Sequence, residues 1–305
     1  MPHSTASPLG TIETTINYYN EPPPGEQFPV QYVHTVGSKR LKHNVQNVRV
    51  TDLRSTDNHF TIHENGFQFL QYPGEEGIKH ETFADDDAIK TKVYEEVKDV
   101  IKKATGASDV LVFNHVCRRA PYQVVLDIPQ DAPDMQKLPK QHPAMLAHVD
   151  QSYHGADLLL ANLNHEGAAE IKAKAQKHRW GIINLWKPLR TIIREPLAVC
   201  DATTVPESDL RPVTLRILKE DHPAHMTEDR DVELWHIAHN PQHRWYWPSE
   251  MKPDEALLIK CFDSKTEGVA RRAPHSAIRL PNDQGPPRES IELRAIVVYA
   301  HEAKA

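Results

Sequence analysis

The chain is poor in the patterns that mark several large classes of protein. Only three cysteines occur in 305 residues, Cys117, Cys200 and Cys261, and they are far apart with no CxxC pair. An odd and scattered set of this kind argues against a disulfide framework and against a thiolate zinc site. We therefore expect three free thiols.

Long apolar runs and long basic runs are also missing. No apolar stretch approaches the roughly 20 residues that a membrane helix needs, and the opening MPHSTASPLG has neither the basic nor the apolar region of a signal peptide. The pairs Arg118-Arg119 and Arg271-Arg272 are too short for a nucleic-acid footprint in a chain of formal net charge -6. The sequence therefore predicts a cytoplasmic protein that binds neither membrane nor nucleic acid and acts on a small molecule.

The chain divides by composition into a short arm and one large domain. Residues 1–30 are rich in proline and polar residues and include Pro22-Pro23-Pro24, which predicts an extended N-terminal arm. No break divides residues 31–305, so we expect a single domain there, with its N-terminal strands and a helix packed on the core. The arm offers a way to hold a second subunit, and the sequence is therefore compatible with a homodimer.

Most of this domain shows strand patterns. Short runs of alternating apolar and polar residues, separated by Gly, Asn and Pro, indicate antiparallel strands, and Asn65-Gly66 predicts a tight hairpin. Residues 85–105 differ, with acids in front, apolar residues at helical spacing and Gly106 at the end, which predicts a helix. A second, short helix is predicted at 165–177. The expected fold is mainly β, a sandwich or barrel with a few flanking α-helices.

One short motif points to a metal. His148 and Asp150 are two residues apart, and on a strand such residues face the same side. Alone this is a weak signal. With a second histidine it makes a face of two imidazoles and one carboxylate, which leaves coordination positions open and suits iron(II).

The C-terminal region supplies the remaining parts. His275 lies in APHSAIRLP, and Arg288 and Ser290 open the strand that follows a proline-bearing turn. An arginine offers a planar fork for a carboxylate, and the Arg-x-Ser spacing points both side chains the same way. Arg294 lies on the same face of this strand and is the alternative anchor.

Longer segments carry a family resemblance. They are HVDQSYHGA, INLWKPL with PLAVCDA, NPQHRWYWPSEMKPDEALLIKCFDS, and APHSAI followed by PPRESIELRAIVVY. In these segments the chain resembles the oxygenase/desaturase family that includes the fungal gibberellin desaturase and the bacterial cephamycin methoxylation component. The resemblance implies a double-stranded β-helix, or jelly roll, with Fe(II) and 2-oxoglutarate. By this likeness His148, Asp150 and His275 match the metal positions, and Arg288 and Ser290 match the cosubstrate pair.

Three further residues are candidate substrate contacts. Asn184 and Trp186 alternate on the strand INLWKPL and would face the cavity together, while Tyr153 follows the metal motif closely. The strands rich in aromatic residues carry little charge, which favours a fairly apolar substrate.

These observations predict a 2-oxoglutarate-dependent dioxygenase that uses O2 to hydroxylate or desaturate an unactivated carbon of a small secondary metabolite. Two alternatives stay open. One is a cupin-type metal enzyme on the same barrel that needs no 2-oxoglutarate, for which Arg288 would be dispensable. The other is a non-catalytic jelly-roll protein that binds a ligand, for which bound iron would be absent.

Overall fold

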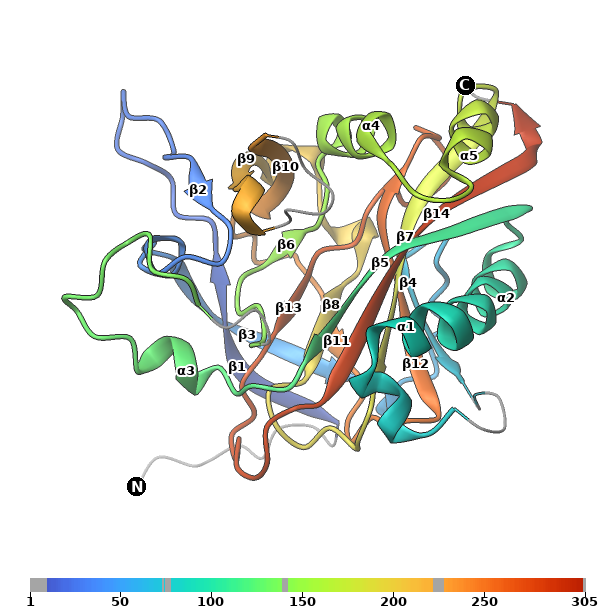
Figure 1. The fold of residues 1–305 in the computed structure, drawn as a ribbon. Coiled ribbons are helices and arrows are strands. Elements are labelled where there is room, and N and C mark those ends of the chain that lie inside the picture. The colour runs from blue at the N-terminus through green and yellow to red at the C-terminus, as the bar shows by residue number, and fades with distance from the viewer. Residues whose placement is uncertain (1–9, 73, 75–77, 139–141, 222–227, 304–305) are drawn as a thin grey trace.

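Two β-sheets that face each other form most of the molecule (Figure 1). The computed structural model describes residues 10–72, 74, 78–138, 142–221 and 228–303. The nine-stranded sheet has the order β1 (Thr11–Tyr18), β3 (Asn44–Asp52), β11 (Trp245–Trp247), β8 (Leu197–Cys200), β13 (His275–Ala277), β6 (His148–Val149), β10 (Arg230–Ile237), β9 (Leu210–Ile217) and β2 (Gln31–Tyr32). The five-stranded sheet has the order β4 (Phe67–Gln71), β12 (Glu255–Asp263), β7 (His178–Pro188), β14 (Ser290–Ala303) and β5 (Asp109–Arg118).

Strand β7 shows how the sequence builds the two faces of the smaller sheet. Ile183 and Leu185 pack on the outer side in a cluster with residues of the main helix, whereas Ile182 and Trp186 pack on the inner side against the opposite sheet. Both faces are covered, so ten of the eleven residues of β7 are buried. A near-continuous apolar strand is what double-sided burial requires.

The predicted helix at 85–105 is confirmed as three consecutive pieces on the outer face of the smaller sheet (Figure 1). They are α1 (Asp86–Ala88), a π-helical turn (Ile89–Val93) and α2 (Tyr94–Thr105). The Asp85 carboxylate caps the start by accepting hydrogen bonds from the amides of Asp87 and Ala88. Gly106 ends it with a φ of +72°. The second predicted helix is confirmed as α5 (Ala168–Ala175).

The hairpin predicted at Asn65-Gly66 is wrong. Strand β4 begins at Phe67 and pairs with β12, which lies far along the chain, so no local hairpin forms. Asn65 instead donates from Nδ2 to the carboxylate of Asp201. Gly66 has a φ of +78°, and a Cβ there would lie 2.9 Å from the Cβ of Ala273. The Asn-Gly pair therefore packs closely against the chain at Asp201 and Ala273 just before β4 begins.

The N-terminal stretch is extended but is part of the larger sheet. All eight residues of β1 pair with β3, and residues 1–9 of the expected arm lie outside the described part of the chain. The described residues also form the α-helices α3 (Gln123–Leu126) and α4 (Tyr153–Asn162). Within the described ranges, no helix is both long and apolar enough to cross a membrane.

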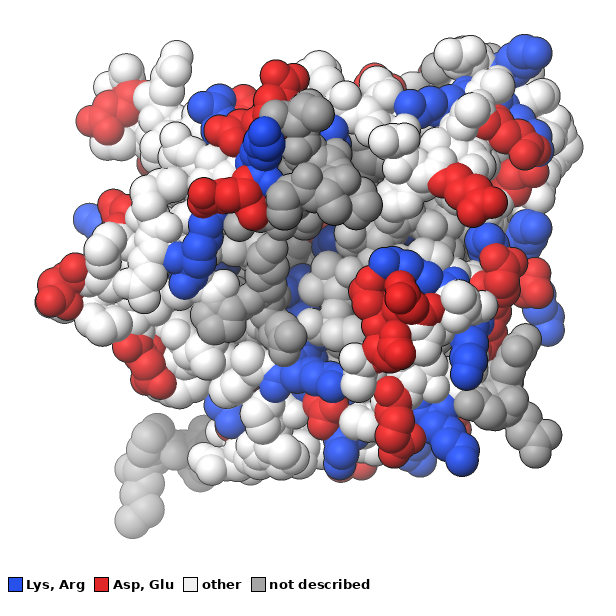
Figure 2. Space-filling view, viewed as in Figure 1, with Lys and Arg blue, Asp and Glu red and all other residues white. Residues whose placement is uncertain are grey.

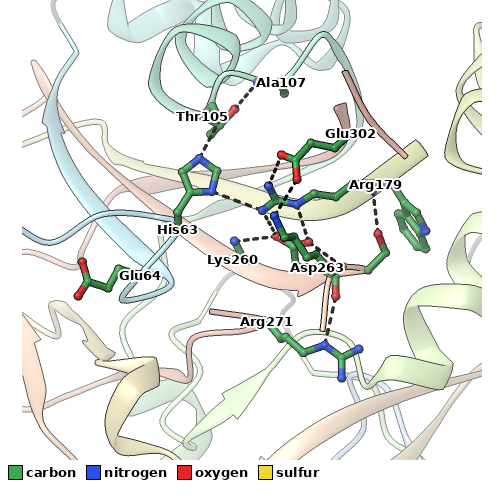
Figure 3. A network of polar contacts seen from close by, with 12 residues as sticks. His63, Glu64, Thr105, Ala107, Arg179, Lys260, Asp263, Arg271 and Glu302 are labelled. Carbon is green, nitrogen blue, oxygen red and sulfur yellow. Dashed lines mark hydrogen bonds and ion pairs between the residues drawn. The ribbon is translucent and has the colours of Figure 1, made fainter. Parts of the chain in front are cut away.

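A buried ionic network joins three neighbouring strands at one end of the smaller sheet (Figure 3). The Asp263 carboxylate on β12 accepts hydrogen bonds from Arg179 at 2.6 Å and from Lys260 at 2.8 Å. Arg179 on β7 also donates to Glu302 on β14 at 2.7 Å. Lys260 and Asp263 are almost fully buried, so each charge depends on its partner.

Candidate metal centre

The register of the larger sheet brings two distant histidines together. His148 on β6 pairs directly with His275 on β13, and Asp150 follows β6 by one residue. Oδ1 of Asp150 lies 3.4 Å from Nε2 of His148 and 4.0 Å from Nε2 of His275. One ligand atom from each of the three residues falls within 4.8 Å of the others. Both measured separations are below twice a metal–ligand bond of about 2.1 Å, so Oδ1 of Asp150 can share an ion with either imidazole nitrogen.

The imidazole rings are oriented by backbone carbonyl groups. Nδ1 of His148 lies 2.7 Å from the carbonyl oxygen of Leu146, and Nδ1 of His275 lies 3.4 Å from that of Ala273. With Nδ1–H donating to the carbonyl, the lone pair of each Nε2 faces the centre. Burial, reinforced by the nearby His148, lowers the pKa of His275 to about 4, which keeps this ring neutral and able to bind a metal.

The carboxylate of Asp150 is held by two donors on the opposite sheet. Its Oδ2 accepts hydrogen bonds from Nε of Arg294 at 2.9 Å and from Nδ2 of Asn184 at 2.8 Å. Burial alone would raise the pKa of Asp150, but the charge of Arg294 and the contact with His148 bring it well below its ordinary value. The group is therefore ionised, with Oδ1 left for a cation.

Helix α4 fixes the chain directly after Asp150. The Ser152 hydroxyl accepts a hydrogen bond from the amide of Gly155 at 2.7 Å, and the Ser152 amide donates to the Glu233 carbonyl on β10 at 2.9 Å. A Cβ at Gly155 would lie 1.9 Å from that carbonyl oxygen, so only glycine lets the helix approach β10 this closely. This helix was not predicted from the sequence.

A second carboxylate faces the centre from β14. Ser290, Glu292 and Arg294 alternate along this strand and share its inner face, which the contacts of Arg294 with Asp150 identify. Glu292 is 5% exposed and accepts hydrogen bonds from Asn184 at 3.0 Å and Arg294 at 2.9 Å. Sequence reasoning missed Glu292, although its i+2 spacing from Ser290 and to Arg294 was the signal that could have found it.

Arg288 and Ser290 are buried beside this face with unmet hydrogen-bonding capacity. Arg288 donates from one terminal nitrogen to the carbonyl of Glu195 at 2.7 Å and lies 5.4 Å from the Trp186 ring centroid. Among the described residues, its Nε and the Ser290 hydroxyl have no hydrogen-bond partner. Burial, followed by the charge of Arg118, lowers the pKa of Arg288 to about 9. These groups would suit an anionic ligand.

The three predicted substrate contacts lie in different surroundings. Asn184 binds Asp150 and Glu292, as described above, and Trp186 lies on the same inner face beneath Arg288. Tyr153 starts α4, donates its hydroxyl to Glu207 at 2.8 Å, and has the guanidinium of Arg271 3.6 Å from its ring centroid. The structure therefore brings Asn184 to Asp150, places Trp186 next to Arg288, and ties Tyr153 to Glu207 and Arg271.

Two cavities among the described residues do not reach the three candidate metal ligands. One, of about 290 Å³, borders Glu195 and Arg279, and the other, of about 670 Å³, borders Arg271 and Arg272. None of the three candidate ligands lines either cavity. Ligand geometry, rather than cavity volume, therefore selects the site.

Comparison with known proteins agrees with this geometry. The family model described as "Oxidoreductase/YMDC permease-like domain" matches residues 16–298. The chain is 41% identical to the hydroxylase/desaturase efuI of Hormonema carpetanum over 96% of its own length and 97% of the relative's. It is 33% identical to the alpha-ketoglutarate-dependent dioxygenase phiK of a fungal species (strain ATCC 74256), covering 98% of this chain and all of phiK.

A solved structure shows the same fold. The iron and alpha-ketoglutarate-dependent endoperoxidase NvfI superimposes with a TM-score of 0.74 at 24% identity, over 96% of this chain and 99% of that one. This likeness confirms the predicted mainly β, jelly-roll fold. The resemblance inferred from the sequence segments is confirmed by the relatives, among them the gibberellin cluster GA4 desaturase of Gibberella fujikuroi at 28% identity. The chain therefore belongs to this oxidoreductase family, together with fungal hydroxylase/desaturases and alpha-ketoglutarate-dependent dioxygenases.

Proposed function

We propose that this protein is an Fe(II)- and 2-oxoglutarate-dependent dioxygenase that hydroxylates or desaturates an unactivated carbon of a small secondary metabolite. His148, Asp150 and His275 are the proposed ligands of the iron. The observation that carries the proposal is their convergence: atoms from two strands and a following turn lie within 4.8 Å of one another inside a family of oxidoreductases.

The donor set fits iron(II). Two neutral imidazoles and one carboxylate on one side of an ion leave positions open for a cosubstrate and dioxygen. The second oxygen of Asp150 is engaged by Arg294 and Asn184, which restricts this carboxylate to binding through Oδ1. When bound, the iron would supply the oxidative chemistry that no protein side chain provides.

Arg288 and Ser290 fit the distal carboxylate of 2-oxoglutarate. Both are buried, and their free donors, Nε and the hydroxyl, are the kind of group that a carboxylate satisfies. Arg294, the alternative anchor, already contacts Asp150 and Glu292 at 2.9 Å each. We therefore assign the cosubstrate to Arg288 and give Arg294 the task of positioning Asp150.

The remaining inner wall positions the substrate. Trp186, Leu257 and Ile259 form part of a buried apolar cluster on the inner side of the smaller sheet. Such a wall excludes water and orients an apolar molecule, and orientation of the target carbon is the protein's main contribution to this chemistry. Asn184 completes the wall beside the metal. A cytoplasmic location and a homodimer stay predictions from the sequence.

The test is an anaerobic titration followed by a turnover assay. Wild-type protein with Fe(II) should develop a metal-to-ligand absorption band when 2-oxoglutarate is added, and should release succinate in air. Asp150→Ala should lose the band. Arg288→Met should raise the half-saturating 2-oxoglutarate concentration at least about tenfold, because a charged hydrogen-bonding partner is removed. Arg190→Met is the matched control, since that side chain is 66% exposed and pairs with Glu289.

Each alternative has its own outcome in this experiment. If Arg288→Met behaves like wild type while Asp150→Ala is inactive, a metal enzyme without 2-oxoglutarate is favoured. If wild-type protein binds no iron and shows no band, a non-catalytic jelly roll is favoured and the proposal fails.

A further inference from the structure

Glu195 has a backbone conformation that costs energy. Its φ is +48°, in the left-handed region that residues other than glycine rarely adopt. The next residue is Pro196, and a residue before proline prefers an extended backbone. Among the described residues, His34 and Glu250 also have a positive φ, but neither is buried, whereas Glu195 is 2% exposed. Strain of this kind persists only where surrounding contacts hold it.

Three parts of Glu195 make hydrogen bonds to three separate segments. Its carboxylate accepts from the Tyr122 amide, whose nitrogen lies 3.0 and 3.1 Å from the two oxygens. Its amide donates to Oδ1 of Asp283 at 2.7 Å. Its carbonyl accepts from Nη1 of Arg288, also at 2.7 Å. One strained residue therefore joins the segment before α3, the loop between β13 and β14, and the proposed anchor of the cosubstrate.

The contact with Glu195 fixes the position of Arg288. Within the described part of the chain it is the only hydrogen bond of this guanidinium, and Nε has no partner. The Trp186 ring, with its centroid 5.4 Å from the guanidinium carbon, borders the group. The direction of the free donors therefore depends on where one main-chain carbonyl lies, and that carbonyl lies where the strained backbone of Glu195 puts it.

Polar contacts, rather than close packing on every side, keep Glu195 in this conformation. A cavity of about 290 Å³ borders the residue, with Arg279 and Asp283 also in its lining. The loop that carries Glu195 and the loop between β13 and β14 lie together at the lower end of the molecule in Figure 1, where Arg194 donates to the Gly285 carbonyl at 3.2 Å. Loss of the Glu195 carboxylate would therefore leave room for the backbone to relax.

Surface charge offers the cosubstrate little help. Figure 2 shows acidic and basic side chains interspersed over one face of the molecule, and the whole chain has a formal net charge of -6. Such a distribution does not attract a dianion such as 2-oxoglutarate over a distance. Affinity for the cosubstrate would then rest on the buried anchor, so the placement of Arg288 matters.

We propose that Glu195 is a positioning residue for the cosubstrate: its strained backbone, held by Tyr122 and Asp283, presents the carbonyl that orients Arg288 toward the distal carboxylate of 2-oxoglutarate. This inference rests on the proposed function and deepens it by one residue, which acts through Arg288. The simpler role for Glu195 is to fasten two loops, which would affect stability alone. The two roles differ in whether cosubstrate affinity depends on Glu195.

The test is the anaerobic titration of the full-length Fe(II) protein with 2-oxoglutarate, read from the absorption band. Glu195→Ala removes the carboxylate that holds the strained backbone. It should raise the half-saturating 2-oxoglutarate concentration about three- to tenfold, the loss expected for one net hydrogen bond. Fe(II) affinity, measured by chelator competition, should stay at the wild-type value. Glu195→Gln should keep most of the cosubstrate affinity, because its amide oxygen can still accept from Tyr122.

A double-mutant cycle with Arg288→Met separates positioning from general damage. If Glu195 acts through Arg288, Glu195→Ala should cause no further loss of 2-oxoglutarate affinity once Arg288 has been replaced. A purely structural role would give the same loss with and without the arginine.

Two more variants control for folding and for backbone strain. Glu195→Gly removes the same carboxylate, but glycine adopts a positive φ without strain, so this variant should be at least as stable as Glu195→Ala in denaturant. It should still bind 2-oxoglutarate more weakly than the wild type, which keeps the test decisive where Glu195→Ala folds poorly. Glu250→Ala is the matched control, since Glu250 has a φ of +44° at an exposed position. It should keep the cosubstrate affinity of the wild type.

Wild-type affinity for 2-oxoglutarate in both Glu195→Ala and Glu195→Gly would overturn the proposal, and so would equal losses in the two backgrounds of the cycle. A missing absorption band in wild-type protein is a separate outcome that would defeat the proposed function itself. A normal band that responds to Arg288→Met but not to the Glu195 variants would defeat only the role of Glu195.

Discussion

Arg294 holds Asp150 from the opposite sheet, with its Nε 2.9 Å from Oδ2 of the carboxylate. The two residues come from facing sheets, so this bond also sets the distance between the sheets at the metal site. Asn184 donates to the same oxygen, and both donors reach Glu292 as well. The guanidinium of Arg294 and the amide of Asn184 therefore lie between the two carboxylates and hold Asp150 through Oδ2, with Oδ1 toward the histidines.

Replacing Arg294 should weaken the metal site without touching a ligand. Arg294→Met removes the charge that keeps the pKa of Asp150 low and leaves Asp150 and Glu292 to repel each other. We expect Fe(II) affinity to fall about 10- to 100-fold, the usual cost of losing a partner behind a metal ligand. Competition titration with a chromogenic chelator measures this, and Arg294→Lys should recover part of the loss. An unchanged affinity in Arg294→Met would show that Asp150 needs no such support.

Gly155→Ala should damage the centre through the backbone. The new methyl group would lie 1.9 Å from the Glu233 carbonyl, so α4 must move away from β10, and the turn that carries Asp150 moves with it. We expect a loss of stability of about 1–3 kcal/mol and weaker metal binding. Gly106→Ala is the control, because its φ of +72° gives strain of roughly 1 kcal/mol with no atom within 4 Å of the added group. Denaturant unfolding measures the stability of both variants, and metal titration measures their metal affinity. Equal metal affinities in Gly155→Ala and Gly106→Ala would contradict the proposed movement of Asp150.

The parts of the site that the sequence predicts are those that a local spacing encodes. His148 and Asp150 two residues apart, and Arg288 and Ser290 at the head of a strand, show their common direction in the chain itself. His275 is distant in the chain, and the layout of the C-terminal strands together with the family resemblance suggested that it lies beside them. The structure brings all three candidate ligands together.

What the sequence does not reveal depends on contacts between distant segments. Asn65-Gly66 has the residues of a hairpin, yet β4 finds its partner in β12, because sheet pairing overrides a local turn preference. Helix α4 was missed because its polar start lies within the metal motif and hides the beginning of the helix.

Asp263→Asn should destabilise the whole domain. The substitution leaves Arg179 and Lys260 facing a neutral amide in a buried network (Figure 3), and removing one member of a buried ion pair costs roughly 3–5 kcal/mol. Asp231→Asn is the matched control. Its partner Arg216 is on the surface, where such a pair is worth about 0–1 kcal/mol. Chemical denaturation measures the free energy of unfolding of both variants. If the two variants lose similar amounts of stability, the buried network contributes no more than a surface ion pair.

The stability of the metal-free protein should fall as the pH drops from 6.5 toward 4. Burial lowers the pKa of His142 to about 4 and that of His236 to about 3, whereas in the unfolded chain both should titrate near 6.5. Below pH 6.5 the unfolded chain therefore binds protons that the folded chain refuses, and the free energy of unfolding decreases by up to about 1.4 kcal/mol per pH unit for each histidine. The loss from His142 ends near pH 4, where the folded protein also takes up the proton. His236→Gln should make the free energy of unfolding depend less steeply on pH, because the contribution of this histidine is removed. His154→Gln, at an exposed position, should keep the pH dependence of the wild type. Because all other groups are common to the three proteins, a slope in His236→Gln equal to that of the wild type would show that this imidazole is not held neutral by the fold.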